Sequence, residues 1–256
     1  MSKNLGVFVF LISVLVLNSC TTVDTKRQEI ASIKMHMAIS ELQKNNLPES
    51  LRLLLEAEEL NGKDPLIQNN LGLVYFLRKR YDQSMKHFSK ALEVDDKFTE
   101  ARNNLARVYI EIKQYQKAES ILAVVVEDLT FSKFVSSYNN MGLAKFHLKK
   151  YEEALTYFTK SVESFREDCF SQLYMGRSLL ELKKNKLAAA RLDMAAYFCK
   201  QNQIDEAHYY GAIAYYRLGR IDQSLNRFNE VIKFFENGPN KDNAKEMIQM
   251  IEKDLR

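Results

Sequence analysis

The 256-residue sequence contains no tryptophan, only three prolines and only eight glycines. Proline and glycine break helices and shape tight turns, so their scarcity argues against a strand-rich sandwich. Hydrophobic residues make up 46% of the chain and charged residues 27%, which is enough for a buried core and argues against disorder. The composition therefore predicts an all-α protein whose helices are joined by short turns.

Several chemical motifs are missing as well. The cysteines lack zinc-ligand spacing, no HExxH pair is present, and neither a glycine-rich phosphate loop nor a GxSxG elbow occurs. The net charge is only +4, and no basic tract with interleaved aromatic residues points to nucleic acid. We therefore expect no enzymatic activity, no cofactor, no metal and no nucleic-acid partner. The four histidines are expected at the surface or in a binding groove: His36, His87, His147 and His208.

The N-terminus carries the most distinctive short motif. Lys3 precedes an apolar run from Leu5 to Leu17, which is short for a membrane-spanning helix and typical of an export signal. Residues 17–20, with the sequence Leu-Asn-Ser-Cys, resemble the bacterial lipobox. This resemblance implies a signal peptide over residues 1–19 and a lipid anchor on Cys20. An ordinary signal peptide or an uncleaved anchor helix are the alternatives.

The residues around Cys20 add detail to this interpretation. Asn18 departs from the usual lipobox, in which a small or β-branched residue stands at this place. Thr21, rather than an aspartate, follows the cysteine, and by resemblance to Gram-negative lipoproteins this implies an outer-membrane location facing the periplasm. Residues 20–30 are polar and lack periodicity, so we expect a short tether between the lipid and the folded domain.

Beyond residue 30 the chain repeats itself. The sequence Asn-Asn-Leu-Gly-Leu-Val-Tyr at 69–75 recurs as Asn-Asn-Leu-Ala-Arg-Val-Tyr at 103–109, displaced by 34 positions, and as Asn-Asn-Met-Gly-Leu-Ala-Lys at 139–145, displaced by a further 36. A second motif follows each of these, beginning at Tyr81, Tyr115 and Tyr151. A period of 34 residues with this pattern resembles the tetratricopeptide-repeat family, whose units are antiparallel helix pairs.

The register of the repeats can be tested where two helices must approach closely. Small residues occupy the eighth position of every unit: Ala38, Gly72, Ala106, Gly142, Gly176 and Ala212. Bulky residues occupy the twenty-fourth: Leu54, Phe88, Leu122, Phe158, Leu192 and Phe228. This alternation of small and large side chains is what interdigitating helices require, whereas a generic helical bundle would not need it.

The register sets the predicted domain boundaries. We expect a right-handed superhelix of six helix-turn-helix repeats over 31–238, followed by a capping helix over 239–256. The repeats are 31–64, 65–98, 99–134, 135–168, 169–204 and 205–238. Two-residue insertions in the third and fifth repeats are expected in turns. In the capping helix one apolar face is formed by Ala244, Met247, Ile248, Ile251 and Leu255.

In tetratricopeptide-repeat proteins the first helices line a concave groove that can hold a peptide or a helix, so the resemblance implies protein binding. The candidate groove residues are Asn70, Leu73, Phe76, Leu77, Asn104, Arg107, Asn140, Leu143, Phe146 and His147. The amides can pair with the backbone of an extended ligand, the leucines can bury apolar side chains, and Arg107 and Lys145 can hold a carboxylate. The alternatives are that the asparagines only join neighbouring repeats and that the aromatic residues belong to the core.

Two cysteines remain besides Cys20. Cys169 begins the first helix of the fifth repeat and Cys199 ends its second, so an antiparallel pair brings both to the same end. In an oxidising periplasm two such thiols tend to be joined, and we expect a disulfide here. The alternative is two buried free thiols whose Cβ vectors diverge.

Taken as a whole, a lipobox, a short tether, six repeats and a terminal helix resemble the pilotin-like lipoproteins of type IV pilus systems, the PilF/PilW/Tgl family. This resemblance implies a protein-binding scaffold that assists assembly or stability of the outer-membrane secretin through which the pilus emerges. Only Cys20 carries over as a functional position. Other scaffold roles stay open: an adaptor for peptidoglycan hydrolases or proteases, a subunit of the outer-membrane barrel insertion machinery, or a regulatory subunit of a cell-envelope enzyme.

Overall fold

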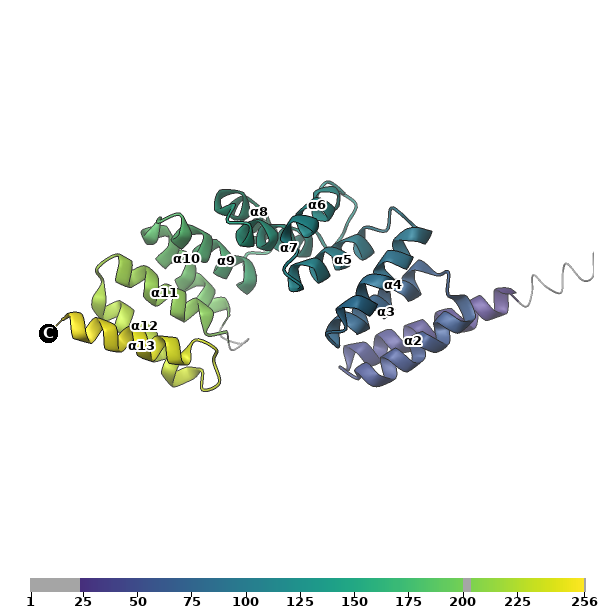
Figure 1. The fold of residues 1–256 in the computed structure, drawn as a ribbon, viewed down its shortest axis with the longest axis horizontal. Helices are drawn as coiled ribbons and strands as arrows, with labels where there is room; N and C mark the ends of the chain where they lie inside the picture. The colour runs from purple at the N-terminus through teal and green to yellow at the C-terminus, as the bar shows by residue number, and fades with distance from the viewer. Residues whose placement is uncertain (1–23, 200–203, 256) are drawn as a thin grey trace, which may run out of the picture. The chain divides into compact units, whose positions relative to one another are not determined.

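The computed structural model describes residues 24–199 and 204–255, and these residues form helices joined by short connections, with no strand among them (Figure 1). A first helix covers residues 24–43. The helices that follow are α2 (Leu47–Asn61), α3 (Pro65–Leu77), α4 (Tyr81–Val94), α5 (Thr99–Glu111), α6 (Tyr115–Val125), α7 (Phe134–His147), α8 (Tyr151–Ser164), α9 (Cys169–Glu181), α10 (Asn185–Phe198), α11 (Glu206–Arg217), α12 (Ile221–Phe234) and α13 (Lys241–Asp254). The predicted all-α class is confirmed.

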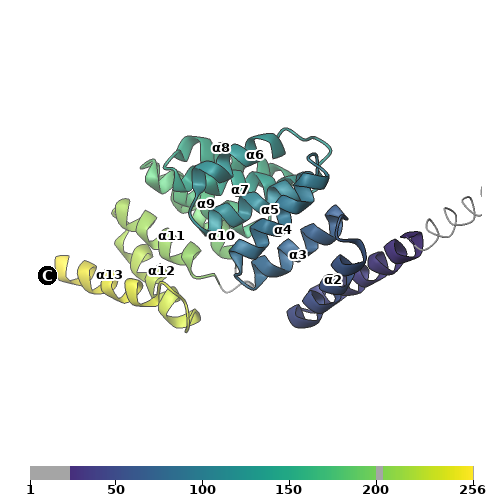
Figure 2. The same cartoon turned by 45° about the vertical axis from the view of Figure 1, so that its right-hand side comes forward.

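The chain divides into two compact units, unit 1 up to Val108 and unit 2 from Tyr109 onward. Within unit 1, α3 packs against α4, and within unit 2 the pairs α7 with α8, α9 with α10 and α11 with α12 lie side by side (Figures 1 and 2). Each of these four predicted repeats thus holds one packed helix pair. The third repeat carries its insertion between α6 and α7, outside both helices.

The small-against-large pattern reflects direct packing between the two helices of a repeat. A Cβ atom added to Gly142 on α7 would come within 2.7 Å of the Phe158 ring on α8, and one added to Gly72 would come within 2.6 Å of Phe88. Both rings are buried. Because a methyl group at such a distance overlaps the ring, the absence of a side chain lets the two helices approach closely.

The turn between the helices of each pair contains one residue with a left-handed backbone. These residues are Asn45, Lys79, Lys113, Lys149, Lys183 and Gly219, with φ between 57° and 70°. In the fourth repeat the amide of Lys150 donates to the carbonyl of Lys145 at 2.9 Å, and the amide of Lys149 donates to that of Phe146. Such paired bonds end a helix sharply, which allows the second helix to fold back on the first.

The N-terminal part departs from the sequence prediction. Residues 24–30, assigned to the tether, are helical and exposed, so the first helix extends back beyond the first repeat. The signal peptide over 1–19 and Cys20 lie outside the described residues. Among the residues that are described, no helix is long and apolar enough to cross a membrane.

The last helix, α13, packs on α12. Ala244 and Ile251 are buried against Phe228 and Val231, with Met247 and Ile248 partly buried beside them. This covers apolar surface at the end of the sixth repeat, as a capping helix does. Leu255 was placed on the same face, but it follows the end of the helix and is 65% exposed, so that assignment was wrong.

Candidate functional site

The candidate groove residues of unit 1 lie on α3 and α5. Leu77 is exposed, Leu73 is half-buried and Phe76 is buried. The Arg107 guanidinium carbon lies 4.3 Å from the centre of the Phe76 ring, which is the geometry of a cation–π contact. The buried Phe76 ring therefore packs against the Arg107 guanidinium, and of these two side chains only Arg107 is exposed to a ligand.

The asparagines of unit 1 are engaged within the chain. The side-chain amide of Asn104 donates to Oδ1 of Asn69 at 3.0 Å, which links the second and third repeats. The amide of Asn70 donates to the Leu66 carbonyl of its own helix at 2.8 Å. Asn104 thus bonds to the neighbouring repeat and Asn70 bonds within its own helix. Leu73, Leu77 and Arg107 form the accessible part of the surface.

In unit 2 the candidates lie on α7, where Asn140 and Leu143 are half-buried and Phe146 is buried. His147 stacks on Tyr115 with ring centres 4.5 Å apart. Burial of the imidazole, and next the charges of Arg177 and Lys113, hold the pKa of His147 below its usual value. The ring therefore favours its neutral form more than a free histidine does.

A residue that was not among the candidates, Arg177 on α9, joins three successive first helices. Its guanidinium carbon lies 5.0 Å from the Phe146 ring on α7, 4.7 Å from Tyr174 and 4.4 Å from Tyr210 on α11. The sequence offered a signal for it, because Arg177 stands at the same place in the fifth repeat as Arg107 in the third, and Phe146 corresponds to Phe76. Arginine on phenylalanine thus recurs two repeats apart.

Two other polar side chains are less accessible than their residue types suggest. Lys145 is buried and forms ion pairs with Glu119 and Glu153, both 2.5 Å away, so it already holds carboxylates of its own chain. His87, expected at the surface or in the groove, is buried with its Nδ1 2.7 Å from the Gln68 side-chain oxygen, so that expectation was wrong. Its ring stacks on Tyr75 between the two helices of the second repeat.

Cys169 and Cys199 are joined by a disulfide, with their Cα atoms 5.0 Å apart. The bond connects the start of α9 to the C-cap of α10 and so closes the fifth repeat at one end. Among the described residues, no group of three or more His, Cys, Asp or Glu side chains could hold a metal ion.

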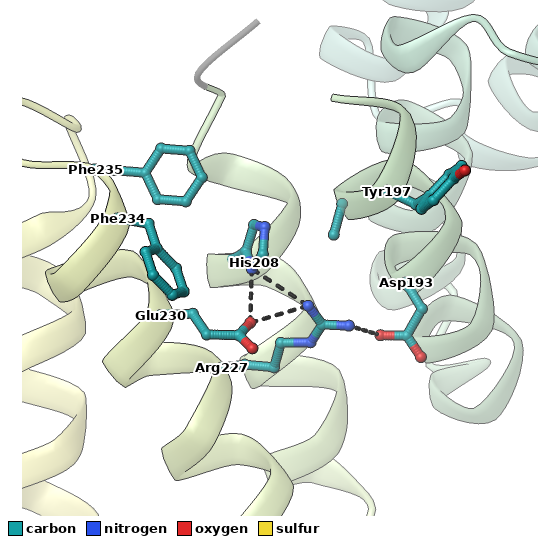
Figure 3. A pocket seen from close by; sticks show the side chains of 8 residues that line it. Asp193, Tyr197, His208, Arg227, Glu230, Phe234 and Phe235 are labelled. Carbon is teal, nitrogen blue, oxygen red and sulfur yellow. Dashed lines mark hydrogen bonds and ion pairs between the residues drawn. The ribbon is translucent and has the colours of Figure 1, made fainter. Parts of the chain in front are cut away.

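A cavity of about 560 Å³ lies in unit 2, lined by residues at α10 and α12 and by His208 of α11 (Figure 3). It is lined by Asp193, Ala196, Tyr197, His208, Arg227, Glu230, Phe234 and Phe235. Arg227 forms ion pairs with Asp193 at 2.5 Å and Glu230 at 3.0 Å. Burial opposes its charge, but these carboxylates outweigh burial and raise the pKa of Arg227.

The sequence-based candidates missed this cavity because they were confined to first helices. A usable signal was the pair of aromatic dipeptides near the ends of two successive second helices, Tyr197-Phe198 and Phe234-Phe235. Aromatic residues that are not needed between helices are candidates for contacts with other molecules.

Comparisons with solved structures identify similar folds over three quarters or more of the chain. PilF of Pseudomonas aeruginosa has a TM-score of 0.76 and 19% identity, covering 88% of this chain and 99% of that one. PilW, a widely conserved type IV pilus biogenesis factor, has a TM-score of 0.76 and 13% identity, covering 84% and 98%. YrrB, a tetratricopeptide-repeat protein with an unusual peptide-binding site, has a TM-score of 0.59 and 17% identity, covering 75% and 97%. At these identities the likeness shows the fold.

No curated protein sequence matches the chain. Four family models, each described as a tetratricopeptide repeat, match residues 36–97, 75–131, 135–168 and 206–238. These matches follow the helix pairs of the first four repeats and of the sixth, and together they cover more than half of the sequence. The chain therefore belongs to the tetratricopeptide-repeat family.

Proposed function

We propose that this protein is a lipid-anchored scaffold of the outer membrane that binds the secretin of a type IV pilus system and assists its assembly. The observation that carries the proposal is the extent of the likeness to PilF and PilW, which takes in nearly all of both proteins and most of this chain. PilW is a type IV pilus biogenesis factor. A repeat array that matches those proteins over this extent is suited to a related role.

The lipobox-like sequence supplies the location in this proposal. Acyl groups on Cys20 hold the mature chain at the membrane, and more than one acyl chain makes the attachment stable. A membrane-held scaffold raises the effective concentration of any partner it binds at that surface. Assembly of a secretin from many subunits benefits from this, because each subunit is captured where the pore must form.

The first-helix surfaces are the proposed contact regions for the secretin. In unit 1 the accessible groups are Leu77, which is 42% exposed, and Arg107 on its phenylalanine support. Apolar side chains flanked by one cation suit an amphipathic peptide or helix with an acidic residue. Binding of this kind needs no catalytic group, so the proposed role is non-enzymatic.

The test is affinity capture of the mature, Cys20-anchored protein from crosslinked membranes, followed by mass spectrometry. Secretin subunits should be the dominant partner. Leu77→Asp should reduce secretin recovery at least fivefold, because a carboxylate in an apolar contact is poorly solvated. Val94→Asp is the matched control, since Val94 is 52% exposed on a second helix of the same unit. Recovery of peptidoglycan hydrolases or barrel-insertion subunits without secretin would overturn the proposal.

A further inference from the structure

One wall of the cavity in unit 2 is an ion-pair network of Arg227, Asp193 and Glu230, which forms the floor of the cavity. Arg227 donates through Nη2 to Oδ1 of Asp193 at 2.5 Å and through Nη1 to Oε2 of Glu230 at 3.0 Å. Guanidinium N–H donors lie in the plane of the group, so bonds to two separate carboxylates restrict the orientation of that plane. Asp193 is fixed in turn by the Tyr215 hydroxyl, which donates to its Oδ2 at 2.6 Å. The guanidinium plane is therefore held in one orientation by two different helices.

Arg227 differs in one respect from three other arginines of the protein, which contact aromatic rings. Arg107, Arg177 and Arg220 each lie over at least one aromatic ring, at 4.3 to 5.1 Å from the ring centre. Within the described part of the chain no ring lies over Arg227. The Arg227 side chain lines the cavity and is 23% exposed, and a flat guanidinium whose edges are engaged can stack on an aromatic ring through its exposed part.

Aromatic side chains stand on both sides of the floor. Tyr197 is 77% exposed and Phe234 is 62% exposed. Figure 3 shows Tyr197 on the α10 side and Phe234 with Phe235 on the α12 side, with Arg227, His208 and Glu230 between them. Large aromatic side chains this exposed on two walls of one cavity leave apolar area that a ligand can cover.

The floor also retains one acceptor. Oε2 of Glu230 pairs with Arg227 and with Nδ1 of His208 at 2.8 Å, whereas no hydrogen bond among the described residues reaches its Oε1. A ligand with an N–H or O–H group on an aromatic ring can donate to this oxygen. An anionic ligand would meet Glu230 and would have to displace a carboxylate from Arg227, and a cationic ligand would meet the guanidinium itself.

We infer that this cavity binds a tryptophan or tyrosine side chain of a protein partner, with the ring stacked on Arg227 between Tyr197 and Phe234. The inference rests on the proposed role in protein binding and adds a second contact region, formed mainly by the second helices α10 and α12 of unit 2. The volume of about 560 Å³ accommodates an indole together with part of the adjoining backbone.

The test is an NMR titration of the mature chain, made with Cys20→Ser so that no acyl group is attached. N-acetyl-tryptophanamide should bind with a Kd on the order of 1 mM, as expected for a ligand of this size. The Arg227 Nε–H signal, identified by its loss in Arg227→Lys, should move upfield, because a ring stacked on the guanidinium shields that proton. No pilus component is present, so the result is independent of whether the secretin is the partner.

Matched variants distinguish ring stacking from nonspecific apolar binding. Tyr197→Ala and Phe234→Ala should each weaken binding about threefold, and Arg227→Lys about fivefold, since lysine keeps the charge but loses the plane. Leu187→Ala on α10, at a residue that is 58% exposed, should leave binding unchanged. N-acetyl-leucinamide and N-acetyl-argininamide should bind at least fivefold more weakly than the indole. Equal binding of the leucine amide, tighter binding of the arginine amide, or no upfield shift would overturn the inference.

Discussion

The two units use the same arginine-on-phenylalanine contact in different surroundings. In unit 1 Arg107 is exposed and lies over the Phe76 ring. In unit 2 the Arg177 side chain is only 16% exposed, lies near three rings and is 3.7 Å from Glu206. Unit 2 also contains the disulfide. The same position of the repeat therefore holds an exposed arginine in unit 1 and, in unit 2, an arginine that packs against aromatic rings of three helices.

The largest expected difference between the units comes from the disulfide. Replacing Cys169 and Cys199 together by alanine should lower the free energy of unfolding by about 3 kcal/mol, because the bond closes a loop of 30 residues in the unfolded chain. Hydrogen exchange should quicken in α9 and α10 while α3 and α4 of unit 1 keep their protection. Unchanged unfolding after reduction of the wild-type protein would show that the bond adds no stability.

The second difference concerns the two arginines. Arg177→Met should destabilise the protein by about 2 kcal/mol, since it removes cation–π contacts with several rings in a largely desolvated site. Arg107→Met should lower stability by less than about 1 kcal/mol, because the cation is exposed and methionine retains the packing of the stem. Urea unfolding of both variants under identical conditions measures this. Equal losses would mean that the number of rings does not decide the strength of the contact.

A third difference lies at the twentieth position of the repeat. In unit 2 the Ser224 hydroxyl donates to the Ala212 carbonyl at 2.9 Å, whereas in unit 1 the buried Ser50 hydroxyl has no hydrogen-bond partner within the described residues. Ser224→Ala should therefore cost about 1 kcal/mol, and Ser50→Ala should be neutral or stabilising by up to about 1 kcal/mol.

The second repeat also has a serine at its twentieth position, Ser84, and this serine provides a control for the comparison. The Ser84 hydroxyl, also in unit 1, donates to the Gly72 carbonyl at 2.8 Å. Ser84→Ala should behave like Ser224→Ala in thermal unfolding. If it behaves like Ser50→Ala instead, the unit rather than the hydrogen bond determines the effect.

The helix pairing could be predicted from the sequence because it depends on positions that recur with a fixed period. Gly142 must face Phe158 wherever the same two helices cross, and the alternation of small and large side chains records this requirement. The start of the first helix could not be predicted in this way. Residues 24–30 are all exposed, so no apolar periodicity marks them as helical.

The candidate site was only partly predictable for a related reason. Sequence periodicity places Arg107 and Arg177 at equivalent positions. It does not show that Tyr174 and Tyr210 lie around Arg177 while Arg107 remains exposed. The cavity at Arg227 depends on side chains of two neighbouring repeats that differ from the repeat pattern. Such contacts are specific to one pair of repeats, and a pattern shared by all repeats carries no information about them.

The smallest expected difference is a dependence on pH. Burial holds the pKa of His87 in unit 1 and of His147 in unit 2 below the value in the unfolded chain. The unfolded chain therefore binds protons more readily, so each histidine contributes stability above about pH 6.5 that is lost as the pH falls through the lowered pKa. His87 is 7% exposed and lies between helices, whereas the His147 residue is exposed beside Tyr115.

We therefore expect the loss of stability between pH 7.5 and pH 5.5 to shrink more in His87→Asn than in His147→Asn. Asparagine can keep a hydrogen bond to Gln68 but does not titrate. We compare the change in stability between the two pH values rather than the stability itself, because the loss of ring stacking lowers stability equally at both pH values and cancels. Urea unfolding of the wild type and both variants at the two pH values measures the change. A larger effect at His147 would show that its stacking on Tyr115 desolvates the imidazole more than burial between two helices does.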